Sequence, residues 1–278
     1  MADALITAAG TVTAIVPEIW SGVYTENLND KIVYNPLIRR DYEGEIANLG
    51  DTVNIPTIAD VTAQNLADGA QGSASTITAS VTALVINKRA YVDFLVSSEA
   101  KLQSIPFMDN LRNLGIAAIL RKMQDDIIAA ISPSTSAPDH TIAYDSANVM
   151  ADADLLEVID LEKTANWPDS GRYLITGGLQ YNDLMAISKF YDKTLGGNSD
   201  LSSGKLLAPV YGHQVDWTTA NGNTSYLFHD SFMQMAIQQG LTVKVFDPGV
   251  NGQRGFRVNM DVLYGIKQVH NDRVISLS

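Results

Sequence analysis

The chain contains no cysteine among its 278 residues. That absence excludes disulfides, zinc–thiolate sites, iron–sulfur clusters and cysteine nucleophiles. Long hydrophobic stretches are also lacking: no apolar run exceeds five residues, whereas a membrane-spanning helix needs about 20. The N-terminus carries an acid, Asp3, where a secretory signal peptide carries basic residues. The sequence therefore predicts neither a membrane-spanning protein nor one secreted by that route.

Positive charge is scarce. Lysine and arginine number 19 against 31 aspartates and glutamates, which gives a formal net charge of −12. A protein that grips nucleic acid usually presents a basic patch. Sequence-specific DNA binding is therefore not expected, and any contact with double-stranded DNA would be weak and non-specific.

Recognisable catalytic motifs are missing as well. The chain has four histidines, far apart in the sequence and outside any metal-binding pair: His140, His213, His229 and His270. Gly204-Lys205 fails as a phosphate-binding loop, because Ser199 stands where the motif needs glycine and Leu206 follows the lysine. No Gly-x-Ser-x-Gly elbow occurs. We therefore predict no catalytic residues, no cofactor and no metal site, and a protein that is not an enzyme.

A long β-hairpin is predicted in the first third of the chain. Thr52–Pro56 alternates apolar and polar residues, as a half-buried strand does. A second strand-like stretch runs over 76–96, and the intervening residues 59–75 are rich in Ala, Gly, Ser, Gln and Asp. An isolated hairpin is only marginally stable in water. Something outside the neighbouring sequence must therefore cover it.

The strongest helical pattern follows this hairpin. One helical face carries five apolar residues: Ile116, Leu120, Met123, Ile127 and Ile131. Pro106 suits the first turn. A helix over 106–131 would extend about 39 Å at 1.5 Å per residue.

Helix and strand patterns alternate in the middle of the chain. Helical periodicity occurs over 153–166, 179–190 and 232–239. Strand patterns occur over 172–176, 210–218 and 224–229. The tail has only strand patterns, over 241–246, 256–266 and 269–275. We expect the tail to pair with the strands before the long helix, closing one α+β domain into which the middle unit is inserted.

These elements leave contact surface that nothing in the chain is suited to cover. An exposed strand edge is a liability in a monomer and an asset in a polymer. The sequence therefore favours a self-assembling subunit. The candidate inter-subunit contacts lie in the N-terminal arm and the hairpin region: Trp20, Asp51, Val53, Ile55, Val81, Val85, Lys88 and Arg89.

Three strings in the N-terminal third resemble those of tailed-bacteriophage major capsid proteins: Pro17-Glu18-Ile19-Trp20-Ser21, Arg40-Asp41-Tyr42-Glu43-Gly44-Glu45 and Gly50-Asp51-Thr52-Val53-Asn54-Ile55-Pro56. The last string, opening an extended hairpin before a long helix, is the most specific. The order of elements also matches over essentially the whole chain. The resemblance implies the Hong Kong ninety-seven type capsid fold.

That fold is an α+β architecture whose parts map onto the sequence in order. They are an N-terminal arm (1–49), an extended β-hairpin loop (50–96), a spine helix with the first part of a peripheral domain (97–139), an inserted α/β axial domain (140–238) and the second part of the peripheral domain (239–278).

The resemblance also implies a function. Copies would assemble as hexamers and pentamers into an icosahedral shell around the double-stranded DNA genome of a tailed phage, inside the host bacterial cytoplasm. A separate scaffolding protein and a portal would be the further partners.

Three other interpretations stay open. One is an encapsulin-like nanocompartment shell protein of the same fold, although the strings within 17–56 argue against it. The second is an enzyme with an inserted domain, which the missing motifs disfavour. The third is a phage tail or decoration protein, which would commonly be a small β fold without a long helix.

Overall fold

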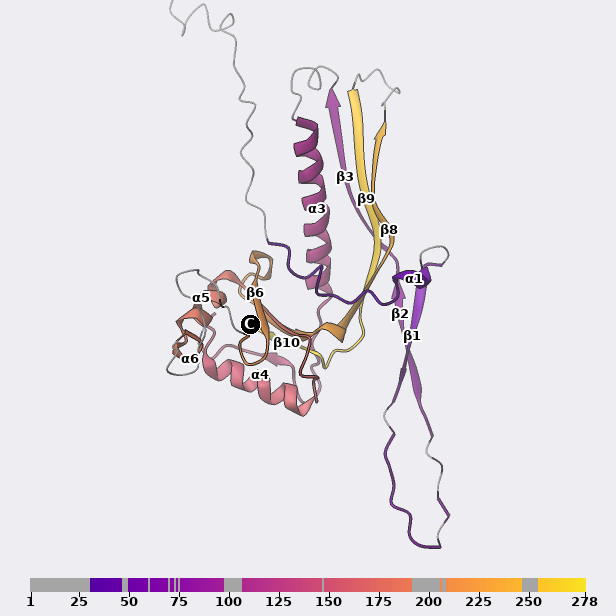
Figure 1. Cartoon of the computed structure of the whole chain (residues 1–278), viewed down its shortest axis with the longest axis vertical. Helices are drawn as coiled ribbons and strands as arrows, with labels where there is room; N and C mark the ends of the chain where they lie inside the picture. The colour runs from indigo at the N-terminus through magenta and orange to yellow at the C-terminus, as the bar shows by residue number, and fades with distance from the viewer. Residues whose placement is uncertain are drawn as a thin grey trace, which may run out of the picture.

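The computed structural model describes residues 31–46, 50–59, 61–69, 71–72, 74, 76–97, 107–146, 148–191, 206, 209–246 and 255–278. Within these ranges the chain forms three sheets and one long helix (Figure 1). The sheets are a two-stranded hairpin, a three-stranded sheet beside the helix and a five-stranded mixed sheet. Ile175, Phe228 and Val274 of the five-stranded sheet share a buried core with the long helix and the three-stranded sheet.

The two-stranded sheet is a hairpin that projects away from the rest of the molecule (Figure 1). It consists of β1 (Thr52–Ile58) and β2 (Ala79–Val85), paired antiparallel. The sequence predicts one continuous second arm over 76–96, but the structure divides it. The Ile86 amide donates to the Asp51 carbonyl at 2.7 Å and closes the hairpin. From Lys88 onward the chain enters another sheet.

The three-stranded sheet has the order β3–β9–β8. Its strands are β3 (Lys88–Ser97), β8 (Met233–Phe246) and β9 (Gly255–Gln268), all antiparallel. The pairing of β3 with β9 confirms that the tail pairs with a strand before the long helix. It also explains why β3 leaves the hairpin, because β9 offers it ten paired residues, more than β1 could supply.

The long helix α3 (Phe107–Ala130) lies along this sheet (Figure 1). Met123 and Ile127 from the predicted apolar face are buried. Gly115 brings the helix close to the sheet: a Cβ at this position would lie 2.9 Å from Met260 Sδ and 3.2 Å from the Phe94 ring. Glycine in a helix interior costs about 1 kcal/mol relative to alanine, and here it is required by close packing.

The five-stranded sheet has the order β4–β10–β7–β5–β6. Its strands are β4 (Thr141–Ile142), β5 (Arg172–Thr176), β6 (Gln214–Trp217), β7 (Ser225–His229) and β10 (Val274–Leu277). Helices α4 (Asp152–Thr164), α5 (Gly178–Ala186) and α6 (Ser188–Tyr191) accompany it, with 3₁₀ turns η3 (Thr219–Asn221) and η4 (Asp230–Phe232). Leu155 and Val158 of α4 pack with Leu174, Leu227 and Ile275 in its core.

Two expectations are wrong, one for the middle of the chain and one for the tail. Of the helix expected over 232–239, residues 233–239 belong to β8, because the long register with β9 outweighs local periodicity. The last strand, β10, does not join the other tail strands; it lies between β4 and β7 in the five-stranded sheet. The boundary predicted at 238/239 therefore falls inside one continuous strand.

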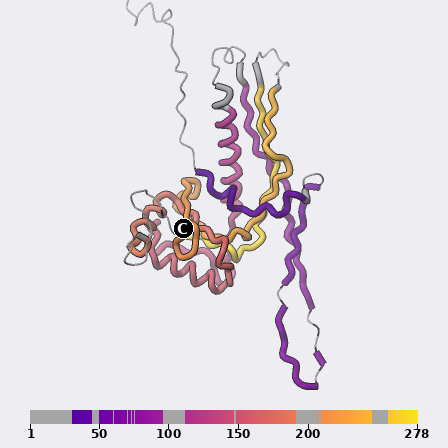
Figure 2. The backbone as a smooth tube through the Cα atoms, viewed as in Figure 1, coloured from indigo at the N-terminus to yellow at the C-terminus, as the bar shows by residue number. Residues whose placement is uncertain are grey.

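The described part of the N-terminal arm, residues 31–46, crosses the molecule from the five-stranded sheet to the base of the hairpin (Figure 2). Tyr34 is fully buried, and its hydroxyl donates to Asn221 Oδ1 at 2.9 Å. Gln124 of α3 accepts from the Val33 amide at 2.7 Å. The short helix α1 (Glu43–Ile46) ends this path beside β1 and β8.

Candidate assembly surfaces

The β1–β2 hairpin has one covered face and one exposed face. Residues directly opposite in an antiparallel pair share a face, and the register places Val53 opposite Leu84 and Pro56 opposite Val81. Val53 and Leu84 are buried, whereas the Val81 side chain is 63% exposed. The two predicted contact residues Val53 and Val81 therefore lie on opposite faces.

The covered face anchors the hairpin to its own subunit. Val53 and Ile55 pack with Leu84, Ile86 and Ala236 in a small buried cluster. Their burial is complete within one chain, so these two predicted contact residues serve first as the hairpin's base.

The exposed face is apolar apart from Thr52 and Asn54 near its base. We call it the hairpin patch, made of Pro56, Ile58, Ala79, Val81, Ala83 and Val85. Ile58 is 69% and Val85 is 38% exposed. Beyond the strands, Val61, Leu66 and Ile77 are also more than half exposed. Contiguous exposed apolar surface of this kind marks interaction sites in soluble proteins.

Lys88 is tied to its own subunit through Asp126 of α3. The ammonium lies 3.4 Å from Asp126 Oδ1, and the carboxylate also accepts from Lys122 at 3.0 Å and from the Tyr264 hydroxyl at 2.6 Å. Burial opposes ionisation of Asp126, but the hydrogen bonds from Tyr264 and Lys122 and the charge of Lys88 outweigh it, so the pKa of this carboxyl is lowered. Asp126 thus holds α3 to β3 and β9.

Arg89 reaches from β3 to β9 on the sheet face turned away from α3. Its Nε donates to Asp261 Oδ2 at 2.9 Å, and Asp261 is only 2% exposed. The Arg89 side chain itself remains 63% exposed. Asp51 is exposed at the start of β1, where its carboxylate accepts from the Thr52 hydroxyl. Trp20 lies outside the described residues.

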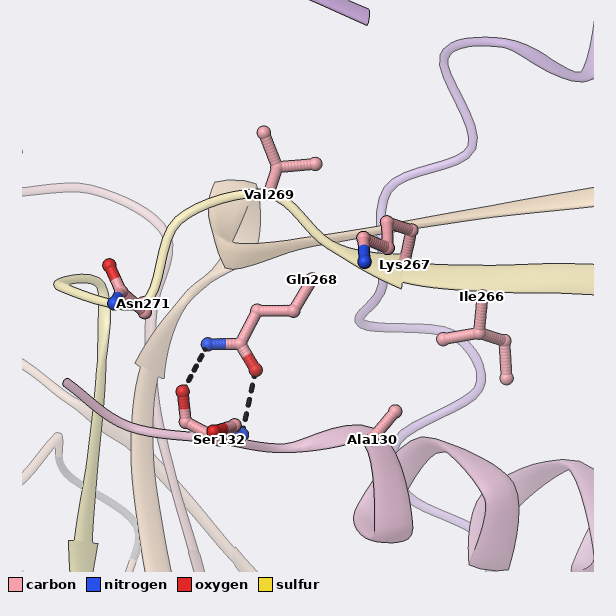
Figure 3. Close-up of a pocket in the computed structure, with 7 residues that line it drawn as sticks. All are labelled: Ala130, Ser132, Ile266, Lys267, Gln268, Val269 and Asn271. Atoms are coloured by element: carbon pink, nitrogen blue, oxygen red, sulfur yellow. Dashed lines mark hydrogen bonds between the residues drawn. The ribbon is translucent and has the colours of Figure 1, made fainter. Parts of the chain in front are cut away.

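An open cavity of about 560 Å³ lies where α3 ends (Figure 3). Its lining residues are Ala130, Ser132, Ile266, Lys267, Gln268, Val269 and Asn271. The Gln268 side chain spans it: Oε1 accepts from the Ser132 amide and Nε2 donates to the Ser132 carbonyl, both at 2.7 Å. This pair fastens the end of α3 to the end of β9.

A buried ionic cluster lies under α4. Glu162 is 1% exposed, His213 Nε2 lies 2.5 Å from its Oε1, and Arg172 Nη1 donates to its Oε2 at 3.2 Å. Arg172 also donates to the Trp167 and Pro168 carbonyls. The group is closed by its own chain on every polar side, so it stabilises the five-stranded unit. No local motif in the sequence indicated it, since its members are 10 to 51 residues apart.

Within the described ranges, no group of three or more histidines, aspartates or glutamates is arranged to hold a metal ion. Among the same residues, no helix combines the length and the apolar character that crossing a bilayer requires.

Comparison with known proteins identifies the fold. No family model matches the sequence, and no curated protein sequence matches it. Solved structures do match. A chain in the structure titled "Capsid structure of the Cyanophage P-SCSP1u" is 13% identical, with a TM-score of 0.76, covering 98% of this chain and 96% of that one.

Two further structures agree. A chain from Mycobacterium phage Che8 is 22% identical with a TM-score of 0.75, covering 95% of this chain and 97% of that one. A chain of the bacteriophage PhiM1 mature capsid is 12% identical with a TM-score of 0.67, covering 99% and 96%. The protein therefore has a mixed α/β fold shared, over nearly its whole length, with phage capsid chains.

Proposed function

We propose that this protein is the major capsid protein of a tailed phage, a structural and non-enzymatic subunit that assembles with copies of itself into an icosahedral shell. The observation that carries the proposal is the fold likeness to capsid chains over 98% and 99% of the chain. A likeness that spans both chains almost completely leaves little room for an added catalytic domain. The virion capsid is the corresponding location.

The parts of the capsid fold are assigned as follows. The β1–β2 hairpin is the extended loop, α3 is the spine helix, the three-stranded sheet with α3 is the peripheral domain, and the five-stranded sheet is the inserted axial domain. The passages of the chain between β7 and β8 and between β9 and β10 support this division, since each leads from one sheet to the other. The five-stranded sheet shares one core with α3 and the three-stranded sheet, and has a second core that includes Leu155 and Val158 of α4.

The hairpin patch supports self-association. Burying an apolar surface stabilises a contact by roughly 25 cal/mol per Å², and none of the residues that the structure describes covers this face. We assign Val81 and Val85, with the exposed Arg89 and Asp51, to the inter-subunit contact. Val53, Ile55 and Lys88 support it from within the subunit. Trp20 is retained as a contact in the arm.

A scaffolding protein, a portal and weakly held double-stranded DNA are the proposed partners. The net charge of −12 suits a shell through which packaged DNA must slide. The nanocompartment interpretation is less favoured, because the structures that this fold resembles come from phages.

Negative-stain electron microscopy with sedimentation tests the proposal. The purified protein, alone and co-expressed with a phage scaffolding protein, is expected to give closed polyhedral shells or capsomer-sized rings. A monomer that stays monomeric under both conditions would contradict it.

A further inference from the structure

The three-stranded and five-stranded sheets share a buried core and are connected by two passages from strand to strand that lie together. We call these two passages the joint: the turn η4 between β7 and β8, and residues 269–273 between β9 and β10. Backbone hydrogen bonds lock the two segments together. The Val269 and His270 amides both donate to the Phe232 carbonyl, at 2.9 and 3.1 Å, and the His229 amide donates to the Arg273 carbonyl at 3.1 Å. A change in η4 therefore also affects residues 269–273, which these hydrogen bonds hold to it.

His229 caps η4 with its imidazole ring. The Ser231 amide donates to His229 Nδ1, with an N···N distance of 3.2 Å, and the Ser231 hydroxyl lies 2.8 Å from the same nitrogen. Arg273 donates to that hydroxyl oxygen, so the hydroxyl proton is free to point at Nδ1. Nδ1 must therefore accept, which requires the neutral ring. The His229 residue is 4% exposed, so water cannot replace these partners.

A second acceptor is placed beside the same nitrogen. Asp230 Oδ1 lies 3.1 Å from His229 Nδ1 and is buried without a hydrogen bond within the described structure. Arg39 of the arm forms an ion pair with this carboxylate, with Nη2 at 3.0 Å from Oδ1. The neutral tautomer that accepts from the Ser231 amide carries its proton on Nε2 and cannot donate from Nδ1, whereas a protonated ring can. The site thus holds two alternative partners for one nitrogen.

We propose that His229 is a proton-operated switch of the joint between the two sheets. When the ring is neutral, it accepts from Ser231 and keeps η4 capped. When it is protonated, Nδ1 donates to Asp230, the Ser231 amide loses its acceptor, and η4 and the segment 269–273 loosen together. This inference does not depend on the proposed function, because it concerns the subunit alone.

The surroundings set the pH at which the switch operates. The charged and titratable groups that act on the ring are Asp230 on η4, Arg39 on the arm, and His270 and Arg273 in the segment 269–273, where Asp272 lies beside His270. Burial is the largest influence and lowers the pKa of His229. Asp230 and a backbone hydrogen bond with Ser170 oppose this, whereas Arg273 and Arg39 add to it. Burial and Arg273 also lower the pKa of His270. The closed joint is therefore expected at neutral pH, with opening below about 6.5, the ordinary value for histidine.

The joint has a natural reporter in Trp167. Its indole Nε1 donates to the Asp272 carbonyl at 2.8 Å, and the residue is 5% exposed. We would replace Trp20 and Trp217 by phenylalanine and titrate Trp167 fluorescence from pH 8 to pH 5 on the full-length protein. Hydrogen exchange of 230–232 and 269–272, corrected for intrinsic rates, would be measured alongside. Protection should fall by up to about tenfold for each pH unit between about 6.5, the ordinary value for histidine, and the lowered pKa of His229 in the closed joint, and should level off below that pKa.

Two variants should move the midpoint of the pH transition of the joint in opposite directions. Arg273→Gln removes a cation that opposes protonation, so the midpoint should rise. Asp230→Asn removes the anion that favours protonation while keeping an amide oxygen in its place, so the midpoint should fall. Arg112→Gln and Asp125→Asn, both exposed on α3, are the matched controls and should leave it unchanged. His229→Asn keeps an acceptor near the Nδ1 position and should abolish the transition.

The proposal would be overturned by a wild-type protein whose joint shows equal protection at pH 7.5 and 5.5. It would also be overturned if Arg273→Gln and Asp230→Asn shifted the midpoint in the same direction. Because these two variants keep His229, the test survives even if His229→Asn does not fold.

Discussion

Gly265 of β9 lies directly under the carbonyl of Val85 at the end of β2: a Cβ at Gly265 would come within 2.4 Å of that oxygen and within 2.9 Å of Ile86 Cδ1. No real side chain tolerates such a separation. The hairpin therefore leaves the sheet at this point only because position 265 has no side chain.

Gly265→Ala should displace the base of the hairpin. Relieving the clash requires backbone movement, which costs about 1–3 kcal/mol, and the hairpin patch would be reoriented. We expect a lower free energy of unfolding in urea and fewer closed shells per milligram of protein. Gly240→Ala on β8 is the control, because its Cβ would meet nothing within 4 Å. Equal behaviour of the two variants would contradict this account of position 265.

The hairpin patch should matter for assembly and not for folding. Val81→Asp places a charge on a side chain that is 63% exposed, so the free energy of unfolding should change by less than about 0.5 kcal/mol. Shell formation should be lost, since an unpaired charge would be buried in the contact. Leu156→Asp, 48% exposed on α4, is the control for added charge and should still assemble. Normal shells from Val81→Asp would remove the patch from the interface.

The loop beyond the strands should be dispensable for the subunit fold. Deleting 59–75 leaves the β1–β2 register and the buried cluster of Val53, Ile55 and Leu84 nearly intact. We expect a folded, soluble subunit, measured by circular dichroism and thermal melting, that no longer closes shells in electron micrographs. Shells of normal size from this deletion would show that the loop is not an assembly element.

Removing the Glu162 carboxylate from its buried cluster with Arg172 and His213 should lower the free energy of unfolding. Glu162→Ala leaves Arg172 and His213 beneath α4 without their carboxylate, and removing one partner of a buried pair costs about 3–5 kcal/mol. Glu157→Ala, an exposed acid on the same helix, should cost far less. Urea unfolding of both variants gives the comparison, and similar losses would mean that the cluster contributes little.

The lowered pKa of Asp126 predicts that the free energy of unfolding depends on pH in the acid range. Because its pKa is lowered in the folded state, the unfolded chain binds a proton first as pH falls. Its stabilisation is therefore full above about pH 4, the unfolded value, and is lost as pH drops through the folded value. Asp126→Ala should flatten the stability profile below pH 4, whereas the exposed neighbour variant Asp125→Ala should not. Parallel profiles for Asp126→Ala and wild type would refute this.

The sequence by itself determined those features that depend on local pattern. Alternation located β1, and the apolar spacing located α3 within a residue or two of Phe107–Ala130. The strand at Arg172–Thr176 and the helix over Asp152–Thr164 also follow from periodicity. The strings within 17–56 favoured a capsid fold, which the structural comparisons support over nearly the whole chain.

Only the tertiary structure decided the pairings between distant segments. Residues 233–239 carry a helical pattern, yet they form β8 because β9 offers a long antiparallel register. β10 lies in the five-stranded sheet because it pairs there with β4 on one side and β7 on the other. The hairpin buries Val53 and exposes Val81 because the face that carries Val53 packs against Ala236 of β8, close to where the base of the hairpin meets Gly265 of β9. Such choices are set by contacts between segments that are not neighbours in the sequence, and local sequence carries no signal for them.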